Sequence, residues 1–236
     1  MKINDSRFLS SLNVQFSESK GKLFFIEKKE IDSYDENAEK GINYIKKIFK
    51  KLPYFYEFLR AVLSPGESLI KKFTAEDAMK ELLKNGSLEN KIIINIGSGS
   101  RILQSDILGL DIYPYDGVSL VADATALPFK DNVVDMVICE SAMEHMPDAY
   151  KVAEEIDRVI KIGGLLYVTV PFLYPFHASP NDYYRWTLPG LKKFFNNFET
   201  INSGLRAGPM AALQGVLMHI FAILFSFGVE PLYIVL

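Results

Sequence analysis

The sequence predicts an α/β fold in which helices flank a doubly wound, mainly parallel sheet. Short apolar runs rich in β-branched residues, such as Lys91–Ile96, suit strands that are buried on both faces. Stretches of helical periodicity and glycine-rich turns separate these runs, and strands that alternate with helices form right-handed crossovers. Of the 236 residues, 49% are hydrophobic and 23% are charged, which excludes a disordered or fibrous chain.

Charge and cysteine content exclude further classes. The 26 Lys and Arg against 29 Asp and Glu give a net charge of −3, so we expect no nucleic-acid partner. The single cysteine, Cys139, excludes a disulfide framework and a cysteine-based zinc site, and we expect it to be inert packing. The three histidines are scattered, so we expect no metal site. The first 20 residues lack the apolar core of a signal peptide, which favours a cytoplasmic protein.

Composition divides the chain into three regions. We expect a mainly helical N-terminal cap over 1–90, an α/β core over 91–208 and an apolar C-terminal helical segment over 209–236. Within the cap, Lys22–Ile26 is a strand candidate. Apolar residues recur at helical spacing over 38–63, and a second helix is expected from about 67 to 84, where Asn85-Gly86 ends it.

The core region alternates strands and helices. Its expected strands are 91–96, 107–112, 120–122, 133–139 and 165–170, and its expected helices are 149–160 and 189–198. In the first helix, Val152, Ile156 and Val159 share one face at helical spacing. We expect Ile162-Gly163-Gly164 to end that helix.

Glycines and acidic residues follow four successive strands of the predicted sheet. Gly97 and Gly99 come after the first, Asp111 after the second, Asp123 after the third and Glu140 after the fourth. Such sheets bind ligands beyond the carboxyl ends of their strands. Alternate glycines let the backbone turn tightly and approach a ligand, and an acidic residue placed like Asp111 can accept from both hydroxyls of a ribose. The ordered series predicts a cofactor site at this edge.

Residues 91–200 resemble the class I S-adenosylmethionine-dependent methyltransferases, in the subgroup that includes ubiquinone and menaquinone biosynthesis enzymes. The most specific stretch is Ala122–Met136 (ADATALPFKDNVVDM), and Glu144-His145 and Ile160–Gly164 follow at the expected distances. The resemblance implies a Rossmann-like sheet of seven strands, S-adenosylmethionine as cofactor and S-adenosylhomocysteine as product. It also implies a final antiparallel strand pair, for which Glu199–Leu205 and Leu232–Leu236 are the candidates.

The resemblance implies roles for residues on the methionine side of the cofactor. Gly97, Ser98 and Gly99 would pass under the methionine part, and Glu140 would face it. His145 would lie near the cofactor after the fourth strand, although a helix-capping role is an open alternative.

On the adenosine side, the resemblance implies four contacts. Asp111 would hold the ribose hydroxyls and Ile112 would pack on the adenine. Asp123 would accept from the exocyclic amine of adenine, while Ala124 would donate its backbone N–H.

Two departures from the family pattern affect the glycine loop. Asn95 stands where the family usually has an acidic residue, and Arg101 stands where a third glycine is frequent. Asn95 can still hydrogen-bond the ammonium of the cofactor, without a charge. The 11 residues 100–110 leave little room for a helix before Asp111, so we expect a loop or a single turn there.

The segment Pro171–Thr187 follows the fifth strand and concentrates reactive and aromatic residues. His177 is the candidate general base because the unperturbed pKa of histidine lies near neutrality. Asp182 could orient it or bind the acceptor, with walls formed by Tyr183, Tyr184 and Trp186. The alternative is a packed loop in which Asp182 and Arg185 form an ordinary ion pair.

The C-terminal region raises a membrane question. Residues 207–229, 23 in all, contain no Lys, Arg, Asp or Glu. Three interpretations stay open: a helix packed on the core or the substrate cleft, an interfacial membrane helix or hairpin aided by the Lys-rich helix near 42–52, and a membrane span.

These features predict transfer of a methyl group to a small-molecule, lipid-linked or glycan-linked acceptor, on oxygen or carbon. Two alternatives stay open. Asn95 and the short loop would suit a cofactor-binding protein that has lost catalysis, and the apolar C-terminus would suit a membrane-associated scaffold.

Overall fold

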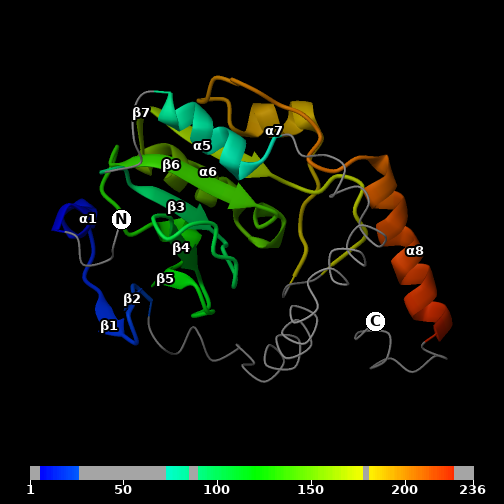
Figure 1. Ribbon diagram of the computed structural model, residues 1–236, viewed down its shortest axis with the longest axis horizontal. Coiled ribbons are helices and arrows are strands. Elements are labelled where there is room, and N and C mark those ends of the chain that lie inside the picture. Colours follow the sequence, from blue (N-terminus) through cyan, green and yellow to red (C-terminus); the bar gives the residue numbers. More distant parts are fainter. Residues whose placement is uncertain (1–5, 27–72, 85–89, 178–180, 226–236) are drawn as a thin grey trace. The chain divides into compact units, whose positions relative to one another are not determined.

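The computed structural model describes residues 6–26, 73–84, 90–177 and 181–225 of the chain (Figure 1). They belong to two compact units, which we treat separately. The first takes in 1–34, 75–172 and 178–202, and the second takes in 35–74, 173–177 and 203–236. The expected helix over 38–63, the start of the helix expected at 67 and the strand candidate Leu232–Leu236 fall outside the described residues.

A seven-stranded sheet forms the centre of the first unit, in the order β1-β2-β5-β4-β3-β6-β7. All neighbours from β2 to β7 pair in parallel, and β1 is antiparallel to β2. The strand order reverses at β3, which lies between β4 and β6, and this switch point is where such sheets bind ligands. The strands are β1 (Ser17–Ser19), β2 (Lys22–Phe24), β3 (Ile93–Ile96), β4 (Leu108–Asp111), β5 (Val118–Val121), β6 (Val134–Glu140) and β7 (Ile160–Thr169).

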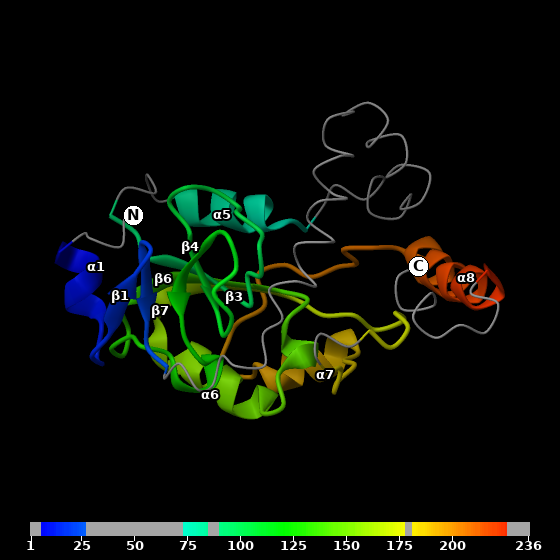
Figure 2. The ribbon, with the colours of Figure 1, turned by 90° about the horizontal axis from the view of Figure 1, so that it is seen from below.

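Helices cover both faces of the sheet, as a doubly wound fold requires. The helices are α1 (Ser6–Ser11), α5 (Ala75–Leu83), α6 (Ala149–Val159) and α7 (Leu188–Phe194), with short 3-10 turns η2 (Ala124–Ala126) and η3 (Met143–His145). Helix α5 lies on one side of the strands, and α6 and α7 lie on the other (Figure 2).

Alternating side chains of the central strands build two apolar clusters. Ile93 of β3 packs in the cluster that contains Met79 of α5, while its neighbour Ile94 packs in the cluster that contains Ile156 of α6. Successive side chains of a strand point to opposite faces, so a strand covered on both faces must be apolar throughout. This is the physical reason why the wholly apolar runs predicted the strands of the core.

The N-terminal region contributes more to the sheet than its expected helical character suggested. The strand candidate at Lys22–Ile26 is confirmed as β2, which pairs in parallel with β5 and carries β1 at the edge. Residues 199–205, which we expected to form a sixth strand, contain no strand. The sheet therefore reaches seven strands through an N-terminal hairpin.

The residues that we expected to end the helix over 149–160, Ile162-Gly163-Gly164, lie inside β7. Helix α6 ends at Val159 because Ile160 takes an extended backbone, with φ −69° and ψ 134°, and begins the strand at once. Gly163 has φ +79°, and the pairing of β6 with β7 shifts its register between Val134 and Met136. The glycine pair thus marks an irregularity in the strand.

In the second unit, the described residues include the apolar helix α8 (Pro209–Phe225). Gly215 of this helix lies against Tyr174 and Pro175, since a Cβ at Gly215 would come within 3.1 Å of both side chains. Within the described parts of the chain, no helix combines the length and the apolar character needed to cross a bilayer.

Candidate functional site

The loop after β3 is shaped by two glycines with left-handed backbones. Gly97 has φ +65° and Gly99 has φ +51°, a conformation that side chains with a Cβ rarely adopt. A Cβ at Gly97 would lie 2.4 Å from the Cβ of Ala142, so the loop packs directly on the turn that follows β6. A Cβ at Gly99 would meet no atom within 4 Å. At Gly99 the backbone is open to close approach by a ligand.

Asp111 joins the end of β4 to this glycine loop. Its Oδ2 accepts from the backbone N–H of Gly99 at 2.8 Å, and its Oδ1 accepts from the N–H of Tyr113 at 3.1 Å. The N–H of Ser98 donates to Leu110 O at 3.2 Å, which adds a second tie between loop and strand. A carboxylate oxygen accepts more than one hydrogen bond, so these contacts are compatible with the predicted ribose hydroxyls.

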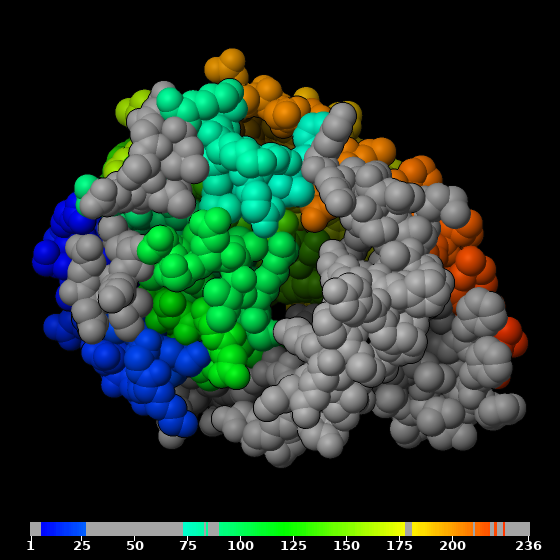
Figure 3. Space-filling model, in the orientation of Figure 1, coloured from blue at the N-terminus to red at the C-terminus, as the bar shows by residue number. Residues whose placement is uncertain are grey.

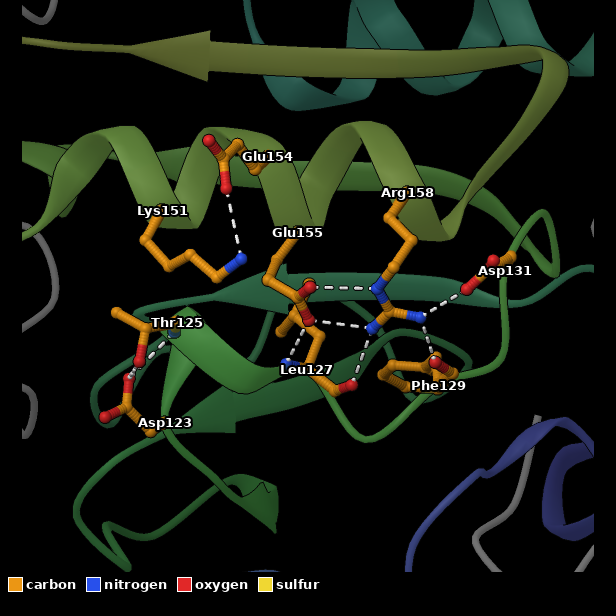
Figure 4. Close-up of polar contacts among 9 residues, drawn as sticks. All are labelled: Asp123, Thr125, Leu127, Phe129, Asp131, Lys151, Glu154, Glu155 and Arg158. Atoms are coloured by element: carbon orange, nitrogen blue, oxygen red, sulfur yellow. Dashed lines mark hydrogen bonds and ion pairs between the residues drawn. The ribbon is translucent and has the colours of Figure 1, made fainter.

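Asp123 lies at the end of β5, next to β4 in the sheet. Its Oδ1 accepts from both the backbone N–H and the hydroxyl of Thr125 at 2.8 Å, which caps the 3-10 turn η2 (Figure 4). The N–H of Ala122 donates to Asp111 O at 3.0 Å and joins the two strand ends. Two carboxylates therefore occupy neighbouring strand ends, and the half-exposed Ile112 follows Asp111.

Two charged residues on α6, Glu155 and Arg158, hold the segment after η2. Glu155 Oε2 accepts from the N–H of Leu127 at 2.8 Å, and Arg158 donates to Leu127 O at 3.0 Å and to Phe129 O at 2.7 Å (Figure 4). Arg158 also donates to Asp131 at 2.8 Å. This network fixes the stretch that continues from Asp123.

The two residues of this network shift each other's ionisation. Burial by itself raises the pKa of Glu155, but hydrogen bonds from Arg158 and from the Leu127 N–H outweigh it and leave the pKa below its ordinary value. The hydrogen bond with Glu155 in turn raises the pKa of Arg158, despite its partial burial. Both groups are therefore held in their charged forms.

Glu140 ends β6 and pairs with the glycine loop. Its Oε2 lies 2.5 Å from Nη1 of Arg101, and the hydroxyl of Tyr167 donates to its Oε1 at 3.4 Å. Arg101 closes the loop through its own N–H, which donates to Ser98 O at 3.0 Å. Asn95 lies buried in β3, in register with Gly109 of β4 and Ile138 of β6. The residues predicted for the methionine side thus gather around one loop.

The part of the aromatic segment that belongs to the first unit is tied to the turn η3. His145 Nδ1 lies 2.6 Å from Asn181 O, and because a carbonyl only accepts, Nδ1 carries the proton. The N–H of Tyr183 donates to Glu144 O at 2.7 Å. His145 and Tyr183 therefore share one local assembly, in which the Tyr183 side chain is 47% exposed.

Asp182 forms the ion pair that sequence reasoning had held as the alternative to a catalytic role. Its two carboxylate oxygens bind the guanidinium of Arg185, with Oδ2 and Nη2 at 2.6 Å, and its side chain is 2% exposed. The Asp182 hydrogen bond raises the pKa of Arg185. The geometry suits Asp182 as an anchor of the loop.

His177, the candidate base, belongs to the second unit. Its Nδ1 lies 3.1 Å from Pro175 O, and its ring meets the ring of Tyr174 edge to face at a centroid distance of 5.0 Å. The structure brings the glycine loop, Asp111 and Glu140 together in the first unit, and it places His177 in the other.

Taken by their chemistry, a glycine loop at the switch point and carboxylates at successive strand ends define an α/β cofactor-binding domain of the nucleotide type. Residues 96–168 match a protein-family model described as a methyltransferase domain. This match supports, for this segment, the class I S-adenosylmethionine-dependent methyltransferase family that the sequence motifs predict. The residues fit that cofactor, because the open Gly99 backbone and the carboxylates suit a ligand with a ribose and an amino-acid end.

Curated relatives share this segment. Demethylmenaquinone methyltransferase of Bacillus pumilus is 31% identical over 85 residues, which are 34% of this chain and 36% of that protein. The 2-methyl-6-phytyl-1,4-hydroquinone methyltransferase of Synechocystis is 37% identical over 90 residues, which are 31% of this chain and 28% of that protein. The chain thus spans about a third of the length of these relatives.

Solved structures of methyltransferases show low similarity to this chain. A phosphoethanolamine N-methyltransferase 2 of Haemonchus contortus, in complex with phosphomonomethylethanolamine and S-adenosylhomocysteine, has a TM-score of 0.43 and 17% identity. The similarity covers 67% of this chain and 46% of that one.

Proposed function

We propose that this protein transfers the methyl group of S-adenosylmethionine to a small-molecule or lipid-linked acceptor, on oxygen or carbon. The observation that carries the proposal is the Gly99–Asp111 hydrogen bond, which joins the open loop at the switch point to the carboxylate of the next strand. When bound there, S-adenosylmethionine would supply a methyl group on a positively charged sulfur.

The protein's own part in this reaction is alignment and proton removal. Asp111 would hold the ribose, Asp123 and the Ala124 N–H would hold the adenine, and the loop would pass under the methionine part. A nucleophile held in line with the methyl carbon gains most of its rate from positioning. We keep His177 as the proposed base. Its imidazole chemistry and its position in the segment after β7 support this role.

Asp182 and Tyr183 remain proposed contributors on the acceptor side. The ion pair of the buried Asp182 side chain with Arg185 supports a positioning role for Asp182, and the half-exposed Tyr183 supports contact with the acceptor. His177→Gln would lower kcat by about a hundredfold or more, because it removes the base, and would leave cofactor binding unchanged. Tyr183→Phe would instead raise KM and leave kcat unchanged.

The acceptor class is a proposal with two supports. The relatives named for demethylmenaquinone and for a phytyl hydroquinone favour a lipid-linked aromatic ring. The family match ends at residue 168, before the aromatic segment of 171–187, so these relatives inform the cofactor half more than the acceptor half. Screening with labelled cofactor should therefore begin with prenylated quinols and extend to glycans.

Peripheral membrane contact is proposed through α8. Its exposed residues Leu213, Leu217, Ile220 and Leu224 recur at helical spacing, and the helix carries no charged residue. Vesicle co-sedimentation tests this proposal. Binding that Leu217→Glu and Ile220→Glu abolish would support it, and a chain that stays in the supernatant would refute it.

The first experiment is a calorimetric titration with S-adenosylmethionine and S-adenosylhomocysteine. We expect binding by the wild type, its loss in Asp111→Ala, and no change in Glu154→Ala, which alters an exposed carboxylate of α6. If the folded wild type binds neither ligand, the proposed methyltransferase activity is refuted and the membrane-associated scaffold protein is favoured. Binding without turnover on any acceptor would favour a cofactor-binding protein, for which the neutral Asn95 is the supporting observation.

A further inference from the structure

Two residues of opposite charge meet beside the glycine loop. The side chain of Glu140 is 11% exposed and the side chain of Arg101 is 53% exposed, with Oε2 and Nη1 2.5 Å apart. Surface ion pairs contribute little to stability, and this one joins a mostly buried acid to a partner that is accessible from solvent. The pair is therefore better suited to binding a ligand than to stabilising the fold.

Strand register places Glu140 over the loop. Asn95 of β3 pairs with Ile138 of β6, so Gly97 and Glu140, two residues further along each strand, reach the same level at the sheet edge. Ile138 packs on the side of α5, and Glu140, two residues on, points to that same face. Tyr167 of β7 packs there too, and its hydroxyl fixes the carboxylate. Figure 3 views the molecule from the side of α5.

The backbone around the pair is held in a defined shape. Ser141, directly after Glu140, has φ +47°, and its N–H donates to Thr169 O at 2.9 Å. A residue with a Cβ in this region is costly and is frequent at functional sites. The turn Ser98–Arg101 brings the guanidinium to the same place. Both charges are therefore preorganised next to the open backbone of Gly99.

We propose that Arg101 and Glu140 together recognise the amino-acid end of S-adenosylmethionine. The guanidinium of Arg101 would bind the cofactor carboxylate, and the carboxylate of Glu140 would bind the cofactor ammonium. This inference rests on the proposed function and names the residues that select the zwitterion.

The chemistry of the two groups supports this assignment. A zwitterion carries one charge of each sign a few bonds apart, and the pair presents one opposite charge to each. Arginine binds carboxylates in a planar, two-pronged geometry and stays charged at every accessible pH. The neighbouring Asn95 is neutral. The carboxylate of Asp111 also stands beside the loop, but it accepts from the N–H groups of Gly99 and Tyr113, so we assign the ammonium to Glu140.

The test compares ligands that lack one charge each. Calorimetry would measure wild type, Arg101→Gln and Glu140→Gln with S-adenosylhomocysteine, its decarboxylated analogue, its desamino analogue and methylthioadenosine. Loss of one charge-assisted hydrogen bond weakens binding about tenfold to a hundredfold. We expect Arg101→Gln to lose that factor for S-adenosylhomocysteine and to bind the decarboxylated analogue as the wild type does. Glu140→Gln should show the same pattern with the desamino analogue.

Two controls separate this result from general damage. Lys80→Gln breaks the exposed ion pair with Asp77 on α5 and should leave every affinity unchanged. The double variant Arg101→Gln/Glu140→Gln leaves no single charge behind, so it should keep the fold, bind methylthioadenosine normally and lose its preference for the zwitterion.

The outcomes distinguish this inference from the proposed function. Equal losses for all four ligands, or unchanged binding of S-adenosylhomocysteine by both single variants, would overturn the role of the pair. A folded wild type that binds none of the four ligands would overturn the proposed function itself.

Discussion

Arg158 binds both oxygens of Glu155, one turn earlier on α6, and both side chains also bind the backbone of Leu127. Arg158 Nε lies 2.8 Å from Glu155 Oε1 and Arg158 Nη2 lies 2.7 Å from Oε2. The Leu127 N–H and C=O thus receive an acceptor and a donor from the same helix, and the C=O also accepts from the Phe129 N–H at 2.8 Å. The pair couples α6 to the stretch that leaves Asp123 (Figure 4).

This network should be a major contributor to stability. Glu155→Leu leaves the buried Leu127 N–H without its acceptor and Arg158 without one of its two carboxylate partners, which should lower the free energy of unfolding by about 2–4 kcal/mol. Glu154→Leu is the matched control, because Glu154 forms an exposed pair with Lys151 and should change stability by less than about 0.5 kcal/mol. Urea unfolding measures the free energy of unfolding of both variants. Equal losses would show that the network does not contribute specially to stability.

The same pair predicts a pH dependence. The folded pKa of Glu155 lies below its ordinary value of 4.5, so its stabilising effect is complete above that pH and is lost as the pH falls through the folded pKa. The difference in unfolding free energy between wild type and Glu155→Gln should be constant above about pH 5 and shrink toward pH 3. A difference that persists undiminished at pH 3 would mean that the ionised form gives no advantage.

The core strands and the Glu155–Arg158 network differ in how far the sequence predicts them. A strand buried on both faces must be apolar throughout, so Ile93 and Ile94 reveal β3 without any knowledge of their partners. The exposed strand β1, with the sequence SES, has no such pattern. Glu155 and Arg158 look like a surface pair at i, i+3, and their real partners are backbone groups of Leu127, 28 and 31 positions away. Only tertiary structure brings these together.

The candidate site also combines local features that the sequence predicts with a long-range contact that it does not predict. Gly97, Gly99 and Asp111 could be predicted because glycine spacing and strand ends are local features. The contact between Arg101 and Glu140 spans 39 positions and depends on the neighbouring positions of β3 and β6, which the order of strands along the chain does not specify.

Cys139 should be inert in the folded chain. Burial, and then the negative charges of Glu144 and Glu140, raise the pKa of its thiol to about 12, and the side chain is fully buried in β6. The thiolate is the reactive form, so a disulfide reagent at pH 8 should modify it only as fast as the chain opens. Because the chain has one cysteine, the absorbance of the released thiol reports it directly. Full modification within seconds without denaturant would contradict the buried placement.

Substituting alanine for each of the two loop glycines should lower stability for different reasons. In Gly97→Ala the new Cβ would lie 2.4 Å from that of Ala142, on a backbone with φ +65°. Strain and overpacking together should cost about 2–5 kcal/mol of stability. In Gly99→Ala the Cβ meets no protein atom, so we expect a loss of about 1–2 kcal/mol from backbone strain alone.

Cofactor binding should separate strain from steric exclusion. Gly99→Ala should bind S-adenosylhomocysteine at least about tenfold more weakly, because its methyl group occupies the space where the backbone would meet the cofactor. Gly21→Ala is the matched control: Gly21 has φ +72° and equally open surroundings, and it lies in the β1–β2 turn. It should lose similar stability in urea unfolding and bind normally in calorimetry. If Gly99→Ala binds as tightly as Gly21→Ala, the loop does not approach the cofactor, and the assignment of Gly99 to the binding site is wrong.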